Sequence, residues 1–211
     1  MTLTLEEAPP ERILLDMTWE GYEAMLEGIQ DRHVFLTYDR GRLEIMSPSP
    51  KHSVSTVRVV RLLWIITEEL GIPMSCFGDM TIRRKDLQRG LEPDSCFYLA
   101  NESRVRGKDQ LDFSKDPPPD LAIEVEISQR LLDRENIYAA LGVPELWRYD
   151  GESIRFFIRR EDASYRQVDR SPSFPQLPPE TIERLLEMSR SMDDTSWAKS
   201  VRKWTQQNLR R

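Results

Sequence analysis

The sequence predicts one α/β domain in which a mixed β-sheet is flanked by helices. Three observations support this fold class. The chain of 211 residues is long enough for one sizeable core and short for two. Its 39% hydrophobic and 31% charged residues are ordinary for a globular protein. Segments with helical periodicity alternate along the chain with short apolar segments typical of strands, which favours a sheet covered by helices.

The N-terminal third contains the signals for a helix, a hairpin and a long buried helix. Thr18 can cap a helix whose apolar residues recur at helical spacing. The segments 33–38 and 42–46 flank an Asp-Arg-Gly turn, a pattern that predicts a tight hairpin. The segment from about 52 to 70 is rich in apolar residues and is followed by a glycine, so we expect a mostly buried helix that ends there.

Short strands are expected through the middle of the chain, with helices closing it. The predicted strands are 73–77, 80–83, 95–99, 120–127, 145–149, 153–158 and 165–168. A helix over 133–141 ends at Gly142. Two amphipathic helices follow, and the stripe of Trp197, Val201 and Trp204 on the second is expected to pack on the domain or on a partner.

These elements suggest three parts along the chain. We assign residues 1–14 to an N-terminal extension, 15–190 to the main domain and 191–211 to a C-terminal amphipathic helix.

Composition excludes several classes of protein. No apolar run approaches the roughly 20 residues that cross a bilayer. Residues 1–11 include three glutamates and no basic residue, unlike a secretory signal. Cys76 and Cys96 do not have the spacing of a metal-binding pair. We therefore expect a cytoplasmic protein with reduced thiols and no membrane association.

The segment 120–127 carries the most informative pattern in the sequence. In a strand, its leucine, isoleucine and valine residues fall on one face, and Glu124 and Glu126 fall on the other. Burying either carboxylate without a partner costs roughly several kcal/mol, as it does for other unpaired buried polar groups. Either a positive group compensates the pair or the segment is an edge strand with a solvated outer face.

Other acids favour the first alternative. Asp94 follows Glu92-Pro93 at the start of an apolar strand, and Glu44 lies within another apolar strand. His52, one of two histidines, opens the long helix, where the alternative reading is a capping or surface residue. Oxygen ligands with one imidazole suit Mg²⁺ or Mn²⁺. Such an ion can orient a phosphate and lower the pKa of an attacking water, so the pattern predicts phosphodiester cleavage.

The basic residues are harder to interpret. A net charge of −6 argues against a generic nucleic-acid binder, whose surface is usually basic. Clusters nevertheless occur, and the residues we expect to contact nucleic acid are Arg83, Arg84, Lys85 and Arg106. The alternative is that each cluster is simply a solvated strand or loop end.

Two sets of residues resemble a known nuclease family. Glu92-Pro93-Asp94, a gap of about thirty residues and the segment 119–126 resemble the PD-(D/E)XK motif. The flanking segments 43–48 and 137–147, together with His52, resemble the Uma-two family of restriction endonucleases over about residues 15–190. The resemblance implies a restriction-endonuclease-like core, Mg²⁺ or Mn²⁺ as cofactor, DNA as substrate and a homodimer.

The resemblance also implies roles for individual residues. Asp94 and Glu124 match the metal-binding acids, whereas Glu126 stands where a lysine is usual. Arg134 occupies the position where many family members have a lysine on the following helix, with Arg130 as the alternative. Because arginine stays protonated at neutral pH, only an electrostatic role is open to it.

Two further residues complete the predicted metal shell. His52 resembles the histidine that some nucleases of the superfamily add to that shell, and Glu44 joins through a water.

The leading hypothesis is thus a divalent-metal-dependent endonuclease of DNA with Asp94, Glu124, Glu126 and Arg134 as its catalytic residues. A second is a catalytically inactive, nuclease-derived module that binds DNA or protein, which the glutamate at position 126 and the acidic net charge favour. A third, a glycosidase using paired carboxylates, lacks an evident aromatic platform for a sugar.

Overall fold

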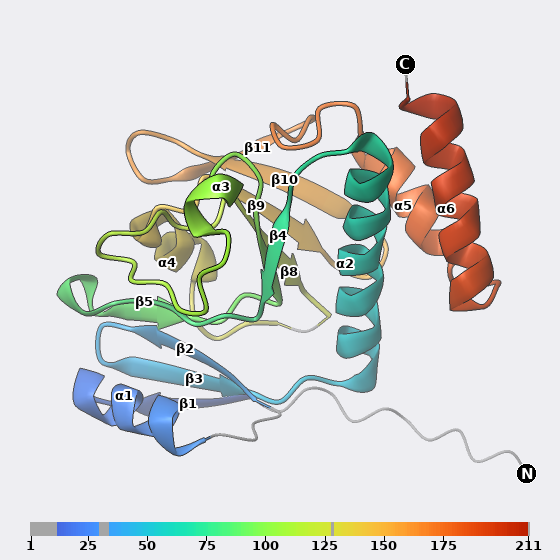
Figure 1. The fold of residues 1–211 in the computed structure, drawn as a ribbon. Helices are drawn as coiled ribbons and strands as arrows, with labels where there is room; N and C mark the ends of the chain where they lie inside the picture. Colours follow the sequence, from blue (N-terminus) through green and yellow to red (C-terminus); the bar gives the residue numbers. More distant parts are fainter. Residues whose placement is uncertain (1–11, 30–33, 128, 211) are drawn as a thin grey trace, which may run out of the picture.

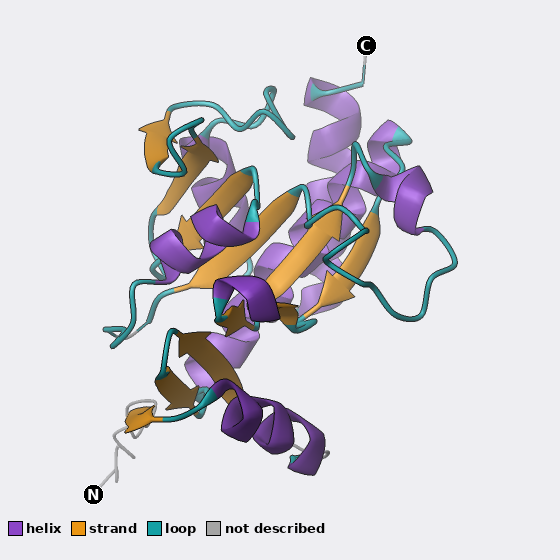
Figure 2. Cartoon of the chain, turned by 90° about the vertical axis from the view of Figure 1, so that its left-hand side faces the viewer, coloured by secondary structure: helices purple, strands orange, loops and turns teal. Residues whose placement is uncertain are grey.

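The computed structural model describes residues 12–29, 34–127 and 129–210, which form two β-sheets flanked by helices (Figure 1). The strand order is β1-β3-β2-β6-β5 in the smaller sheet and β11-β10-β9-β8-β7-β4 in the larger one. The smaller sheet lies below the larger one in Figure 2, with α1 at its outer side. The predicted fold class, a mixed sheet flanked by helices with an N-terminal hairpin, is confirmed.

The smaller sheet is antiparallel throughout and is built around the predicted hairpin. Its strands are β1 (Arg12–Asp16), β2 (Phe35–Asp39), β3 (Arg42–Met46), β5 (Ile82–Arg84) and β6 (Arg89–Leu91). The helix α1 (Trp19–Gly28) begins at Thr18, whose side chain accepts a hydrogen bond from the Gly21 amide. Trp19 and Tyr22 of this helix pack against the hairpin and form a small separate core.

The larger sheet contains one parallel pair, β8 with β9, among antiparallel neighbours. Its strands are β4 (Ser75–Gly78), β7 (Ser95–Tyr98), β8 (Leu121–Val125), β9 (Glu145–Tyr149), β10 (Ile154–Arg159) and β11 (Tyr165–Val168). The helix α4 (Arg134–Leu141) makes the crossover between the parallel strands, as such a pair requires. Between β5 and β6 lies the turn η1 (Lys85–Leu87), and α3 (Glu102–Val105) follows β7.

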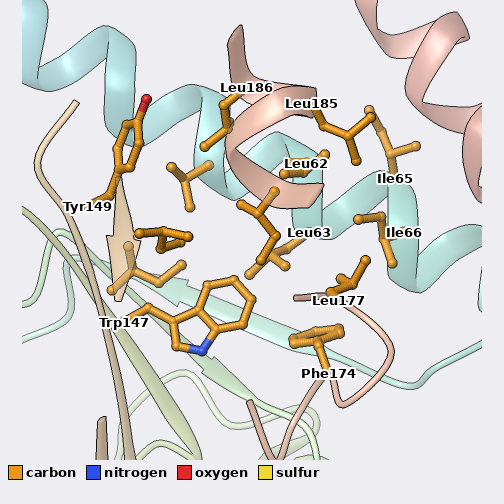
Figure 3. Close-up of a cluster of buried hydrophobic side chains, with 14 of the residues drawn as sticks. Leu62, Leu63, Ile65, Ile66, Trp147, Tyr149, Phe174, Leu177, Leu185 and Leu186 are labelled. Carbon is orange, nitrogen blue, oxygen red and sulfur yellow. The ribbon is translucent and has the colours of Figure 1, made fainter. Parts of the chain in front are cut away.

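The main hydrophobic core fills the face of the larger sheet opposite α4. The helices that cover this face are α2 (Pro50–Leu70), α5 (Pro179–Met188) and α6 (Asp194–Asn208). Trp147 of β9 lies at the centre of the contact with these helices (Figure 3). Its side chain is fully buried among leucine and isoleucine residues of α2 and α5.

The strand β8 separates two cores, which decides where its acids point. Leu121, Ile123 and Val125 belong to the main core, whereas Ala122 belongs to the cluster formed with α4. The alternation predicted for this segment is therefore observed, and it places Glu124 on the α4 side. β8 lies between β7 and β9 with all five residues buried, so the edge-strand alternative was wrong.

Several boundaries differ from the predicted ones. β8 ends at Val125, so Glu126 lies just beyond the strand. The short strand β6 was not predicted, because three residues carry too little periodicity. β1 crosses the boundary we placed between residues 14 and 15; residues 1–11 of the extension, and His33 at the start of the predicted hairpin strand, lie outside the described part of the chain.

The C-terminal helix is integrated into the main core. Trp197 is fully buried and donates a hydrogen bond from Nε1 to the carbonyl of Leu185 at 2.7 Å, and Val201 is equally buried. Trp197 and Val201 of the stripe thus pack on their own domain, whereas Trp204 is only partly buried. None of the helices in the described ranges is long and apolar enough to cross a membrane.

Candidate active site

Asp94 lies where the chain passes from the smaller sheet to the larger one. β6 ends at Leu91 and β7 begins at Ser95, so Glu92, Pro93 and Asp94 form the connection. Glu92 is held by the Leu36 amide and the Thr81 hydroxyl, each at 2.8 Å. Asp94 Oδ2 accepts a hydrogen bond from the Val125 amide at 2.6 Å, which brings this carboxylate to the end of β8.

Glu124 is buried on the α4 side of β8 and is fully surrounded by donors. Its Oε1 atom accepts hydrogen bonds from Arg134 Nη2 at 2.6 Å and from the Tyr138 hydroxyl. Its Oε2 atom contacts Arg130 Nη2. The buried negative charge of Glu124 is therefore compensated by positive groups from the segment that follows β8, which is the first of the two alternatives drawn from the sequence.

Arg134 donates hydrogen bonds to residues of both sheets. Besides Glu124, its guanidinium donates to the Glu92 carbonyl at 2.6 Å and to the Thr37 hydroxyl of β2. Burial opposes its charge, but the neighbouring acids, Glu124 above all, raise the pKa of Arg134 above its usual range. Arg134 is thus a permanent cation, and all three of its guanidinium nitrogens donate hydrogen bonds within the protein.

Tyr138 belongs to the same helix face as Arg134, four residues later. Burial, reinforced by the charge of Glu124, raises the pKa of Tyr138 well above its usual value. The phenol therefore stays protonated and donates to Glu124. Tyr138 was not among the predicted site residues; its spacing of four from Arg134 was the signal that both face the same strand.

His52 faces Asp94 from the first turn of α2. The Ser49 side chain caps this helix by accepting from the His52 amide at 3.3 Å, and the imidazole is buried with Nε2 3.1 Å from Asp94 Oδ1. Burial alone would raise the pKa of Asp94, but His52, Arg130 and Arg134 together hold that pKa below its usual value. Asp94 is therefore an ionised carboxylate at neutral pH.

Arg130 contacts all three predicted acids. Its Nη2 atom contacts Glu124 and lies 3.8 Å from Asp94 Oδ2, and its Nε atom lies 3.4 Å from Glu126 Oε1. Glu126 is also paired with Arg148 Nη2 at 2.6 Å. Arginines thus neutralise the acid cluster from several sides.

The donor chemistry of this cluster suits a hard divalent cation. Asp94 and Glu124 supply carboxylate oxygens, and His52 supplies an imidazole, whose Nε2 faces Asp94 as Glu124 Oε2 faces Arg130. Arg130 nevertheless takes the place of a cation between the acids. Within the described ranges, no three His, Cys, Asp or Glu side chains gather closely enough to hold a metal ion.

An open cavity of about 630 Å³ lies on the α4 side of these acids. Residues lining it include Glu124, Glu126, Arg130, Arg134, Arg148 and Arg155. Arg148 was not among the predicted site residues. Because parallel pairing places it beside Glu124 on β9, only knowledge of the strand order would have revealed it.

Glu44 has a different role from the one predicted. Its Oε2 atom accepts hydrogen bonds from the amides of Leu131 and Leu132, at 3.0 and 2.8 Å, and its Oε1 atom contacts Arg12. Both oxygens that a metal or its water would need are thus engaged. Glu44 anchors the loop that carries Arg130.

The predicted nucleic-acid contacts are not brought to the acids. Arg83, Arg84 and Lys85 line another cavity, beside Trp19 and Asp112. All four predicted residues pair with nearby acids: Arg83 with Glu23 at 3.7 Å, Arg84 with Asp86 at 2.6 Å, Lys85 with Glu20 at 3.6 Å and with Glu23 at 3.9 Å, and Arg106 with Glu102 at 2.5 Å. These clusters match the alternative reading of solvated, ion-paired side chains.

Comparisons with known proteins agree with this arrangement. The family model of Uma2, described as "Putative restriction endonuclease", matches residues 19–191. A crystal structure described as a "putative nuclease belonging to DUF820" from Anabaena variabilis is similar, with a TM-score of 0.50 and 17% sequence identity over 72% of this chain and 90% of that chain. A search of curated proteins found no significant match. The structural likeness supports the fold, and the family match covers the segments that carry Asp94, Glu124 and Arg134. The chain belongs to the Uma2 family of restriction-endonuclease-type nucleases.

Proposed function

We propose that this protein is an endonuclease that hydrolyses phosphodiester bonds of DNA with Mg²⁺ or Mn²⁺. The observation that carries the proposal is the meeting of Asp94, from the β6–β7 connection, and Glu124, from β8, which converge through the Val125 amide and Arg130. Burying two ionised carboxylates so close together is costly unless a cation is held there.

The residues divide into those that hold the ion and those that hold the phosphate. Asp94 and Glu124, with His52 beside them, would hold the ion. When bound, it would polarise the phosphate and lower the pKa of an attacking water. Arg155 lines the open cavity with its side chain 42% exposed and can bind the negative phosphate oxygens, whereas Arg148 is held by Glu126 and Glu135. Arg134 orients Glu124 through Nε and Nη2.

Nicking of supercoiled plasmid is the direct test of the proposed function. The protein should nick DNA slowly with Mn²⁺ or Mg²⁺ and stop when EDTA is added. Asp94→Asn keeps an oxygen for the Val125 amide, so it should fold, but it should lose activity by on the order of 100-fold or more because the charge that holds the ion is gone. The mutant must be purified in parallel, since trace host nuclease would give equal nicking by both proteins; that result would reject the proposal.

Metal binding can be tested separately from cleavage. If Mn²⁺ binds at the acids, a concentration a hundredfold above its Kd adds about 2.7 kcal/mol of stability. For a chain of this size, the melting temperature then rises by roughly 5–10 °C. Glu124→Gln should abolish the rise. Equal stabilisation of parent and Glu124→Gln by Mn²⁺ would place the ion elsewhere.

Arg130 and the ion should compete for the same carboxylates. Arg130→Gln removes the competing charge, so it should lower the Kd for Mn²⁺ measured by calorimetry, by about tenfold for each 1.4 kcal/mol of competition removed. Arg155→Gln is the matched control, because Arg155 lines the same cavity but pairs with Asp150 at 3.4 Å. An unchanged Kd in Arg130→Gln would show that the guanidinium does not occupy the ion's place.

The charge balance also supports the second candidate, an inactive nuclease-derived module that binds DNA or protein. Arg130, Arg134 and Arg148 already neutralise Asp94, Glu124 and Glu126 without an ion. This candidate predicts a folded protein with no nicking in any divalent metal and no Mn²⁺-dependent rise in melting temperature.

A further inference from the structure

The helix α2 has a second apolar face that its own domain leaves uncovered. One face supplies Val59, Leu62 and Leu63 to the main core. On another side, Val57 is 61% exposed and Trp64 is 49% exposed. These two residues are seven apart and therefore lie on one face, two turns from each other. A half-exposed tryptophan and an exposed valine on the same face of a helix form an apolar surface that a ligand can cover.

This face forms one wall of a cavity of about 460 Å³ that reaches the acid cluster. Its apolar lining includes Phe35, Val57, Val60 and Trp64, and it also contains His52 and Asp94. Such a volume lies within the range of small-ligand pockets. The arginine-lined cavity contains Glu124 instead. Asp94 of this cavity and Glu124 of the other both contact Arg130.

We propose that this cavity binds an unpaired nucleobase of the strand that is cleaved, at a distance from the cleaved bond. The inference rests on the proposed function and deepens it, since it defines the substrate as nucleic acid with a base free to leave its stack. Trp64 offers an aromatic face for stacking, and every base presents a complementary face. The cavity leads inward to Asp94 and His52, whereas protein partners commonly need a broad surface of about 1,000 Å² or more.

The position of the basic residues fits the same occupant. Arg61 lines this cavity with its side chain 41% exposed, where it can meet a backbone phosphate. Trp64 lies twelve residues after His52 on α2, roughly 18 Å along the helix axis, so a base stacked on Trp64 belongs to a different nucleotide from the one whose phosphate reaches Asp94. A fully paired duplex keeps its bases stacked and exposes only their edges, so extrusion of a base would be required.

Oligonucleotide binding in EDTA tests the site without cleavage. Two fluorescein-labelled single-stranded DNAs of equal length are compared by anisotropy, one of thymidines throughout and one with abasic positions. The parent should bind the thymidine strand about tenfold more tightly than the abasic strand. Trp64→Ala should remove this preference while leaving the affinity for the abasic strand unchanged, and Trp64→Phe should restore most of it. Ile13→Ala, 53% exposed on the smaller sheet, is the control that should keep the preference.

The outcomes separate this site from the proposed function. A tenfold preference that depends on Trp64 supports the base site even if no plasmid is nicked. Nicking by the parent with equal binding of both strands overturns the base site and leaves the nuclease proposal standing. A Trp64→Ala protein that keeps the preference also overturns it. A third result would also overturn the base site: the parent sediments as a dimer, Trp64→Ala sediments as a monomer, and the two proteins have the same strand preference. The face of α2 would then be an interface between copies of the chain.

Discussion

Replacing Arg134 by alanine should destabilise the protein by about 3–5 kcal/mol, the usual cost of removing one partner from a buried ion pair. The substitution leaves Glu124 with one cation fewer in a site where it is 1% exposed. It also removes the donors to Thr37 and to the Glu92 carbonyl. Equilibrium unfolding in urea measures the loss. Arg84→Ala is the control, because its pair with Asp86 lies at the surface and should contribute less than about 1 kcal/mol.

A second substitution identifies the origin of the loss. If the cost comes from the uncompensated charge of Glu124, adding Glu124→Gln to Arg134→Ala should restore part of the stability. A double mutant less stable than Arg134→Ala would contradict this explanation. Either way, loss of nicking by Arg134→Ala cannot be assigned to catalysis until its folded fraction is known.

Replacing Trp147 by alanine should have an effect of similar size, about 3–5 kcal/mol, because it empties the centre of the main core (Figure 3). The indole also donates from Nε1 to Glu145 at 2.7 Å, so the loss includes a buried hydrogen bond. Trp147→Phe should recover much of the packing. Trp64→Ala, half-exposed on α2, should change unfolding in urea by less than about 0.5 kcal/mol. Equal losses in Trp147→Ala and Trp64→Ala would contradict this assignment of the core.

The sequence predicted what depends on local pattern. The hairpin, the long helix and the two faces of β8 follow from turn residues and from periods of 3.6 or 2. Glu124 could be placed on the inner face of its strand for the same reason. Its convergence with Asp94 came from the family resemblance, because the two residues are joined only through the tertiary fold.

The partners of the acids could not be predicted from local pattern. Arg148 lies beside Glu124 because β9 pairs in parallel with β8, and Glu44 holds residues 131 and 132 across a sequence distance of more than eighty residues. The run of basic residues 83–85 remains a predicted contact for nucleic acid. In the folded protein Arg83, Arg84 and Lys85 also pair with nearby acids, which sequence adjacency does not reveal.

The segment 137–147, which contributes to the family resemblance, contains residues with clear structural roles. Gly142 adopts φ of 83° and ends α4 in the left-handed conformation that glycine favours. Glu145 is buried and accepts from Ser171 and Ser173 as well as from Trp147, so it fixes a loop against the sheet. The block from Gly142 to Trp147 therefore identifies the framework of the family and not its chemistry.

The bridge that Arg134 makes from Thr37 of the smaller sheet to Glu124 of the larger one couples assembly of the site to the docking of two sub-structures. If the smaller sheet opened without global unfolding, Arg134 would lose its Thr37 acceptor, and the Glu92–Asp94 connection would lose the Leu36 amide that holds it. The contacts that position the acid cluster would then be broken, while most amide protons of the protein remained protected from exchange with solvent. Local dissociation of the smaller sheet would therefore disassemble the acid cluster in a molecule that calorimetry still records as folded.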